Sequence, residues 1–176
     1  MGCCTNFAHF CRSLHVDSCL APQKALYFMT PDRRVSRFQA DRWPAPFHLA
    51  RSFLSGHYLT LAEKARIAWG LAALLFEPQD TDPPLVDWLL AHRQTERTIA
   101  RFWGLVLVSA LNESPRRLGL RYARKVFRDA FLAHPRGFQV EVPTVPLGEL
   151  YGPRLRSALE RHGVRFLFQK SARRLL

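Results

Sequence analysis

Apolar residues recur every three or four positions through most of the chain, and this spacing predicts helices. The clearest case begins at Thr60, which stands three residues before Glu63 in the arrangement of a capping box. A helix is therefore predicted from there to Phe76. The residues expected on its buried face are Leu61, Ala65, Ala68, Trp69, Ala72 and Phe76.

Further helices follow from the same spacing and from signals at their ends. Thr95 and Ser114 stand where an N-terminal cap is expected, and Gly163 follows the last periodic stretch. Asp82 is expected to cap a short helix that runs through Trp88. The other predicted helices span residues 1–20, 95–111, 114–131 and 149–162.

Short alternating stretches predict strands between and after these helices. They cover residues 25–29, 35–39, 138–142 and 164–169. The turn residues Thr30-Pro31-Asp32 join the first two as a hairpin, and the breaker Trp43-Pro44-Ala45-Pro46 marks a boundary. We therefore expect an α+β fold, predominantly helical. Its expected segments are an N-terminal helix and hairpin (1–46), a helical lobe (47–142) and a return helix and strand (143–176).

The composition of the chain is strongly basic. The 176 residues carry a formal net charge of +12, and their 48% hydrophobic content is that of a globular protein. Arg117, Arg121, Arg124 and Arg128 are expected to line one face of the helix after Ser114. That face suits an anionic bilayer or phosphate groups, and equally suits a solvated outer surface.

No apolar stretch approaches the roughly 20 residues that cross a bilayer, and no secretory signal is recognised. We therefore expect a cytoplasmic protein, peripheral to the membrane if the arginines contact lipid. Its four cysteines are then reduced. Cys11, His15 and Cys19 have helical spacing, but without a second cluster they indicate buried thiols rather than a zinc site, so no metal is expected.

Several polar and aromatic residues stand out where predicted helices meet or end. Arg93 can hold an anion through its planar fork of donors, and Gln94 can orient a hydroxyl; both can also simply cap helix ends. Asn112 has the same two interpretations. The pair Phe102-Trp103 is either core or the wall of an apolar pocket. No glycine-rich nucleotide turn, P-loop, HExxH or GxSxG motif accompanies them, so no self-sufficient catalytic constellation is recognised.

The order of these segments resembles the substrate-binding lobe of the squalene-associated, FAD-dependent desaturases. These hydroxysqualene dehydroxylases are a branch of the flavin amine oxidase and phytoene desaturase superfamily. The likeness covers nearly the whole chain. The segments that carry it are Gly2-Cys3-Cys4-Thr5-Asn6, Leu26-Tyr27-Phe28, Leu61 to Ile67, His92-Arg93-Gln94, Phe102-Trp103, Ser109-Ala110-Leu111-Asn112, Ala123 to Phe131 and Pro143 to Tyr151.

The resemblance implies an enzyme that uses reduced FAD to remove the hydroxyl of hydroxysqualene and give squalene, on a hopanoid pathway. It implies an apolar tunnel in the helical lobe, lined by Phe102, Trp103, Leu107 and Tyr151. Arg93, Gln94 and Asn112 would lie near the reacting end of the substrate. Ala172 would lie against the adenine of FAD.

The chain also departs from that family. Members begin with a βαβ unit that binds the FAD pyrophosphate, and this unit is not recognised here. Leu105 stands where the family usually has a proline, which changes the expected wall of the pocket. We therefore expect a truncated or split member, inactive alone and completed by a separate FAD-binding chain if split, with no nucleic-acid partner. The alternative is a non-enzymatic basic helical module that binds an anionic membrane or nucleic acid.

Overall fold

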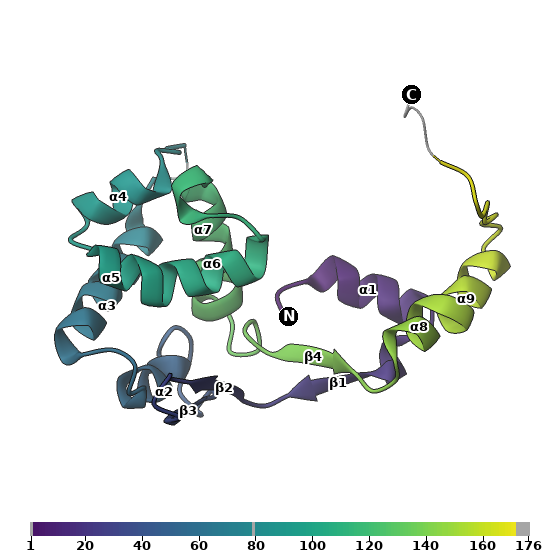
Figure 1. Ribbon diagram of the computed structural model, residues 1–176, viewed down its shortest axis with the longest axis horizontal. Coiled ribbons are helices and arrows are strands. Elements are labelled where there is room, and N and C mark those ends of the chain that lie inside the picture. Colours follow the sequence, from purple (N-terminus) through teal and green to yellow (C-terminus); the bar gives the residue numbers. More distant parts are fainter. Residues whose placement is uncertain (1, 79, 172–176) are drawn as a thin grey trace. The chain divides into compact units, whose positions relative to one another are not determined.

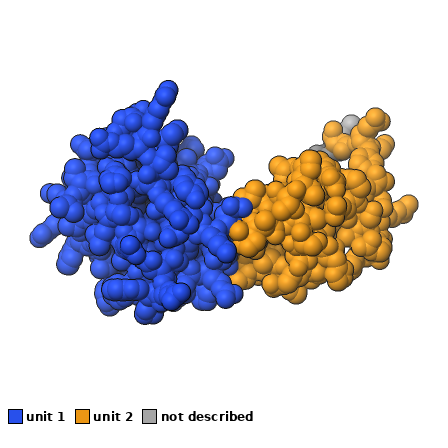
Figure 2. All heavy atoms as spheres, turned by 90° about the horizontal axis from the view of Figure 1, so that it is seen from below, with its two compact units in different colours: residues 1–3, 23–140 blue, residues 4–22, 141–176 orange. Residues whose placement is uncertain are grey.

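Helices dominate the computed structural model, which describes residues 2–78 and 80–171 (Figure 1). Within these residues four strands form two small antiparallel sheets, so the expected α+β class is confirmed. The chain divides into two compact units (Figure 2). Unit 1 comprises residues 1–3 and 23–140, and unit 2 comprises residues 4–22 and 141–176.

These units divide the chain differently from the three expected segments. The hairpin of the segment 1–46 belongs to unit 1, whereas the N-terminal helix of that segment belongs to unit 2. The later crossing, between residues 140 and 141, falls two residues before the boundary expected after residue 142. Each unit has its own cluster of buried apolar side chains, which is what allows a chain to form separate compact bodies.

Unit 1 begins with the expected hairpin. Strand β2 (Leu26–Met29) pairs antiparallel with β3 (Val35–Phe38), and Leu26 lies opposite Phe38. Arg33 adopts a left-handed φ of 62° in the connecting turn, where the Thr30 N–H donates to the backbone oxygen of Arg34 and the Arg33 N–H donates to that of Thr30. A 3-10 turn (Phe47–Leu49) and α2 (Ala50–Ser55) follow the hairpin.

Helix α3 (Leu61–Phe76) starts with the predicted capping box. The Thr60 hydroxyl accepts from the Glu63 backbone N–H at 3.3 Å, and the Glu63 carboxylate accepts from the Thr60 N–H at 2.7 Å. The buried face predicted for α3 is wrong, because Leu61, Trp69 and Phe76 are all exposed. The residues buried on α3 are Glu63, Lys64, Ile67, Gly70 and Leu74.

The rest of unit 1 is helical and surrounds the core. Its elements are α4 (Leu85–Ala91), α5 (Glu96–Thr98), a π-helical turn (Ile99–Trp103), α6 (Gly104–Leu111), a 3-10 turn (Pro115–Arg117), α7 (Leu120–Phe127) and a second π-helical turn (Arg128–Leu132). The helix predicted over residues 114–131 is therefore broken at Leu118-Gly119. Asp82 does not cap α4; its carboxylate accepts from the backbone N–H of Arg121 at the start of α7.

Unit 2 combines an N-terminal segment, residues 4–22, with the segment that begins at residue 141. Its elements are α1 (Thr5–Ser13), a 3-10 turn (Asp17–Cys19), α8 (Leu147–Glu149), a π-helical turn (Leu150–Arg154) and α9 (Leu155–Arg161). Strands β1 (Leu20–Gln23) and β4 (Val140–Pro143) pair where the chain passes between the units. Cys11 and Cys19 are buried in the core of unit 2, as expected for small thiols.

The structure also bears on the predicted C-terminal strand and on the length of apolar helices. Residues 164–171 form no strand, so the prediction of a strand over residues 164–169 is wrong. Among the described residues, no helix is both long and apolar enough to cross a membrane.

Candidate functional site

An apolar cavity of about 460 Å³ lies within unit 1. This volume is within the range of roughly 300–1,000 Å³ typical of small-molecule sites. The hairpin, α2, α3, α6, α7 and the turns beside them supply its walls. The lining residues are Leu26, Phe28, Phe38, Pro46, Phe47, Leu49, Ala50, Phe53, Tyr58, Ala68, Leu71, Ala72, Leu75, Phe76, Phe102, Leu105, Val106, Phe127, Phe131 and Leu132.

Helix α3 explains how the chain leaves this space open. The helix is apolar on two faces, and the face with Ile67, Gly70 and Leu74 packs into the core of unit 1. The other face turns Ala68 and Ala72 toward the cavity, with longer aliphatic residues beside them. Because an alanine side chain ends at Cβ, these two positions leave volume that a leucine would fill.

Aromatic rings form the opposite wall. The Phe102 ring stacks on Phe127, with centroids 5.6 Å apart at 24°, and meets Phe53 edge-on at 5.8 Å. The Trp103 ring is fully buried behind Phe102, at 5.5 Å. These contacts fix the Phe102 ring at the cavity surface, so the wall is preformed rather than assembled by a ligand.

Tyr58 is the only polar side chain among the described residues that line the cavity. Its ring stacks on Phe28 with centroids 6.0 Å apart, and burial raises the pKa of its hydroxyl. The hydroxyl has no hydrogen-bond partner within the described part of the chain. It is therefore neutral at ordinary pH and free to bond a single polar group of a ligand.

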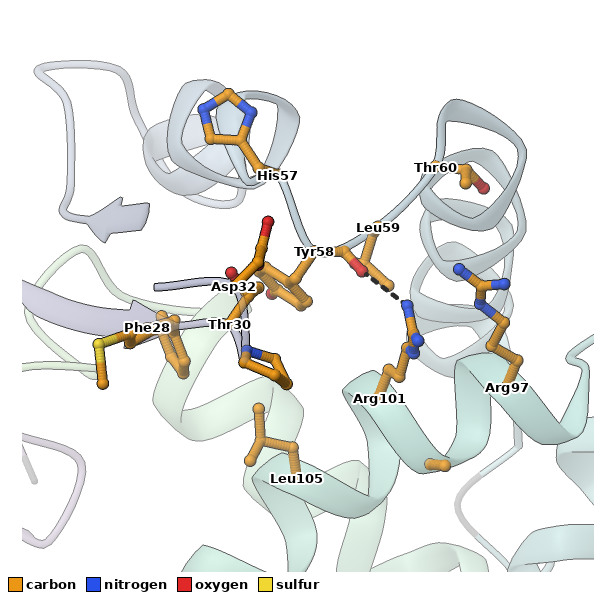
Figure 3. Close-up of a pocket in the computed structure, with 13 residues that line it drawn as sticks. Phe28, Thr30, Asp32, His57, Tyr58, Leu59, Thr60, Arg97, Arg101 and Leu105 are labelled. Atoms are coloured by element: carbon orange, nitrogen blue, oxygen red, sulfur yellow. Dashed lines mark hydrogen bonds between the residues drawn. The ribbon is translucent and has the colours of Figure 1, made fainter. Parts of the chain in front are cut away.

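A second pocket, the polar pocket, has a volume of about 580 Å³ and lies beside the apolar cavity. Figure 3 shows the residues that line it. Phe28, Tyr58 and Leu105 line both. The other residues that line the polar pocket are Met29, Thr30, Pro31, Asp32, His57, Leu59, Thr60, Arg97, Ala100 and Arg101. The two together form a site with an apolar part and a charged part.

Two arginines on one helix supply positive charge to the polar pocket (Figure 3). The Arg97 Nε lies 2.6 Å from a carboxylate oxygen of Glu63. Burial acts to raise the pKa of Glu63, but hydrogen bonds from Thr60 and the charges of Arg97 and Arg101 outweigh it, so this pKa is lowered. Arg101 donates to the backbone oxygen of Tyr58 at 3.3 Å and forms no ion pair within the described residues.

The opposite side of the polar pocket carries one carboxylate. A hydrogen bond from Thr30, together with the charge of Arg34, lowers the pKa of Asp32, whose carboxylate lies 3.0 Å from the Arg34 Nε. Asp32 is therefore ionised and already partnered. Within the described residues no group of three His, Cys, Asp or Glu side chains is placed to hold a metal ion.

Of the predicted site residues, Phe102 is the one that lines the apolar cavity. Gln94 is buried and joins elements instead: its amide nitrogen donates to the backbone oxygens of Arg66 (2.7 Å) and His92 (3.1 Å), and its oxygen accepts from the Trp103 indole at 2.9 Å. Neither Gln94 nor Trp103 lines the cavity or the polar pocket. In this structure their contacts hold the scaffold together.

The remaining predicted residues lie elsewhere. Leu107 is fully buried in the core of unit 1. Arg93 has an exposed side chain and a left-handed φ of 62° after α4, and Asn112 is the left-handed C-cap of α6. Tyr151 belongs to unit 2, where it is half exposed beside a small apolar pocket. Ala172, the expected FAD contact, lies outside the described residues.

The prediction that four arginines form one exposed helix face is wrong. Arg117 belongs to the separate 3-10 turn and pairs with Glu113 at 2.8 Å, and Arg121 pairs with Asp82 at 3.1 Å. Arg124 is buried and donates to the backbone oxygen of Pro78. Arg128 remains exposed. Because the helix breaks and three of the four are engaged, they do not present a continuous cationic surface.

Sequence reasoning missed most of the site. It did not single out Phe53 or Tyr58, which follow the Trp43-Pro44-Ala45-Pro46 breaker, nor Arg97 and Arg101, which follow the Thr95 cap. The four-residue spacing of the two arginines was the available signal, because it places both on one helix face. Comparison with known protein families and with curated proteins finds no match for this chain.

Proposed function

We propose that unit 1 binds an apolar, isoprenoid-type ligand in the apolar cavity. By the sequence resemblance, this ligand is a squalene-type substrate of an FAD-dependent oxidoreductase, of which the chain forms the substrate-binding part. The observation that carries the proposal is the cavity itself: about 460 Å³ lined by aliphatic and aromatic side chains, with one hydroxyl among them.

The chemistry of the lining selects against polar ligands. Moving a hydroxyl or amide into such a space without a hydrogen-bond partner costs roughly 1–3 kcal/mol in proteins, and an isolated charge costs far more. Each buried methylene, in contrast, contributes about 0.8 kcal/mol. A branched hydrocarbon chain therefore gains the most from this cavity, and Tyr58 can bond at most one polar group on it.

The described residues do not fit FAD. Binding its pyrophosphate in this superfamily requires a strand, a glycine turn and a helix within a parallel βαβ unit. The described strands form only two-stranded antiparallel sheets. We therefore assign no flavin step to these residues. In our proposal the flavin is held by sequence outside the described residues or by a separate chain.

Equilibrium dialysis of the purified chain with tritiated farnesol and squalene tests the cavity. Ala72→Phe places a ring in the cavity from an exposed helix position, so the fold should persist while affinity falls at least about tenfold. Ala65→Phe is the matched control, because Ala65 is also exposed on α3 but lines neither pocket. Absence of binding, or an equal loss in both variants, would refute the proposal.

A further inference from the structure

The polar pocket and the apolar cavity lie side by side and share three lining residues. Tyr58 contributes its ring to the apolar side and its backbone oxygen to Arg101, while Leu105 and Phe28 border both spaces. A molecule that occupies the apolar cavity therefore has a charged space next to it, lined by residues of the same unit. An amphiphile fits such a pair of spaces better than a pure hydrocarbon does.

The sign of the net charge in the polar pocket follows from which of its charged side chains are paired with an opposite charge. Arg97 is neutralised by Glu63, and Asp32 is neutralised by Arg34. Arg101 forms no ion pair within the described residues, and Glu63, whose pKa its charge helps to lower, is already paired with Arg97, so the pocket keeps one positive charge in excess. A guanidinium that uses one donor on a backbone oxygen keeps further donors for a planar or tetrahedral anion.

The start of α3 adds to this charge. Thr60, the N-cap of this sixteen-residue helix, lines the polar pocket. The aligned peptide dipoles of a helix place a partial positive charge at that end, although the Glu63 carboxylate in the capping box offsets part of it. The pocket therefore favours a negative group over a positive one.

We propose that the polar pocket binds an anionic oxygen group, a phosphate or a carboxylate, at the end of a ligand whose apolar chain occupies the apolar cavity. Arg101 is the anchor for this group. This inference rests on the proposed function, because it requires the chain of the ligand to lie in the cavity. It keeps the isoprenoid chain of the proposed function but adds an anionic end group, so the expected ligand is an anionic isoprenoid in place of an uncharged squalene.

Equilibrium dialysis of the full chain with four probes tests the inference: farnesyl phosphate, farnesoic acid, farnesol and inorganic phosphate. Farnesyl phosphate or farnesoic acid should bind about tenfold more tightly than farnesol, as expected for a charge-assisted hydrogen bond. The tighter of the two identifies the anion. Added salt should weaken their binding and leave farnesol unchanged.

Three variants assign this preference to Arg101. Arg101→Gln should remove the preference by weakening the binding of the anionic probes much more than that of farnesol, and Arg101→Lys should restore part of the preference by keeping the charge. Arg128→Gln is the matched control, because it removes one positive charge from an exposed position of unit 1 that lines neither pocket. An equal effect of Arg101→Gln and Arg128→Gln would show a general charge effect and overturn the inference.

The remaining outcomes separate this inference from the proposed function. If farnesol binds but neither anionic probe binds more tightly, the polar pocket is not an anion site and the apolar proposal stands. If no farnesyl probe binds but squalene does, this inference fails and the apolar proposal stands; if squalene does not bind either, both proposals fail. If inorganic phosphate alone binds through Arg101, the pocket takes free anions and the amphiphile is rejected.

Discussion

Gly70 is the position where α3 meets Gln94 and Trp103, and replacing it with alanine tests how unit 1 is built. A Cβ added at Gly70 would lie 2.9 Å from the Gln94 amide nitrogen and 2.9 Å from Cζ2 of Trp103. Both neighbours are buried, and the Trp103 indole donates to the Gln94 amide oxygen. Neither side chain can move away without disturbing that hydrogen bond.

Two opposing effects decide the result. Glycine to alanine in a helix interior gains about 1 kcal/mol of stability from backbone propensity. Overpacking a buried site costs about 1–3 kcal/mol, and a buried hydrogen bond left unmade adds about 1–3 kcal/mol more. We therefore expect Gly70→Ala to lower the free energy of unfolding by about 1–5 kcal/mol.

Urea unfolding followed by tryptophan fluorescence measures this change. The four tryptophans of the sequence all belong to unit 1, so the signal reports that unit alone. In a Gln94→Ala background part of the clash is relieved, and the cost of Gly70→Ala should shrink by at least about 0.5 kcal/mol. A Gly70→Ala variant that is more stable than the parent chain would refute the packing described here.

Two further predictions concern the buried His48 and the flavin. His48 is fully buried and neither ring nitrogen has a hydrogen-bond partner among the described residues; burial together with the charge of His134 lowers its pKa. The unfolded chain then binds the proton more readily, so the free energy of unfolding should fall as the pH drops below about 6.5, by at most about 1.4 kcal/mol per pH unit. His48→Leu should flatten this pH dependence in urea unfolding. An unchanged slope in that variant would contradict the assignment of the pH dependence to His48. The purified chain should bind FAD at well below one equivalent, and a stoichiometric flavin absorbance spectrum would contradict our placement of the flavin outside the described residues.

Local signals predicted local structure well. Thr60 and Thr95 both accept from the backbone N–H three residues later, as the sequence indicated. Asn112 takes the left-handed conformation of a C-cap, and the hairpin forms at the turn residues. Each of these features depends on residues within one or two turns of chain, so the sequence pattern alone determines them.

Features that depend on distant residues were missed. The helix predicted over residues 114–131 is interrupted at Gly119, where the chain forms a bridge with Pro84. A Cβ at Gly119 would lie 2.5 Å from the Asp82 carboxylate, so this approach requires glycine. The sequence around Gly119 does not indicate a contact with Pro84, which lies 35 positions earlier. The buried face of α3 was misassigned for a similar reason. A helix that is apolar on two sides has no single apolar face, so the spacing of its apolar residues does not show which face is buried.

The same distinction explains the candidate site. Gln94 and Trp103 stand out in the sequence because a polar residue beside a predicted apolar helix suggests a ligand, yet in the structure they hydrogen-bond each other. A buried amide must bond something, and the sequence does not say whether its partner is protein or ligand. The cavity walls come from segments as far apart as Leu26 and Leu132, so only the folded chain shows which faces meet.

The segment after α9 has an alternating pattern but forms no strand in the described structure. Phe166 and Phe168 stack with centroids 6.2 Å apart, and the Arg156 guanidinium lies 4.9 Å from the Phe168 ring. A strand needs a neighbour to pair its backbone groups, and no described strand lies along this segment. Its apolar residues are instead held by contacts with a cation on α9. If a second chain or further sequence supplies the flavin, a sheet edge there would provide the missing partner, and backbone amide exchange at residues 164–169 should slow when that partner is added.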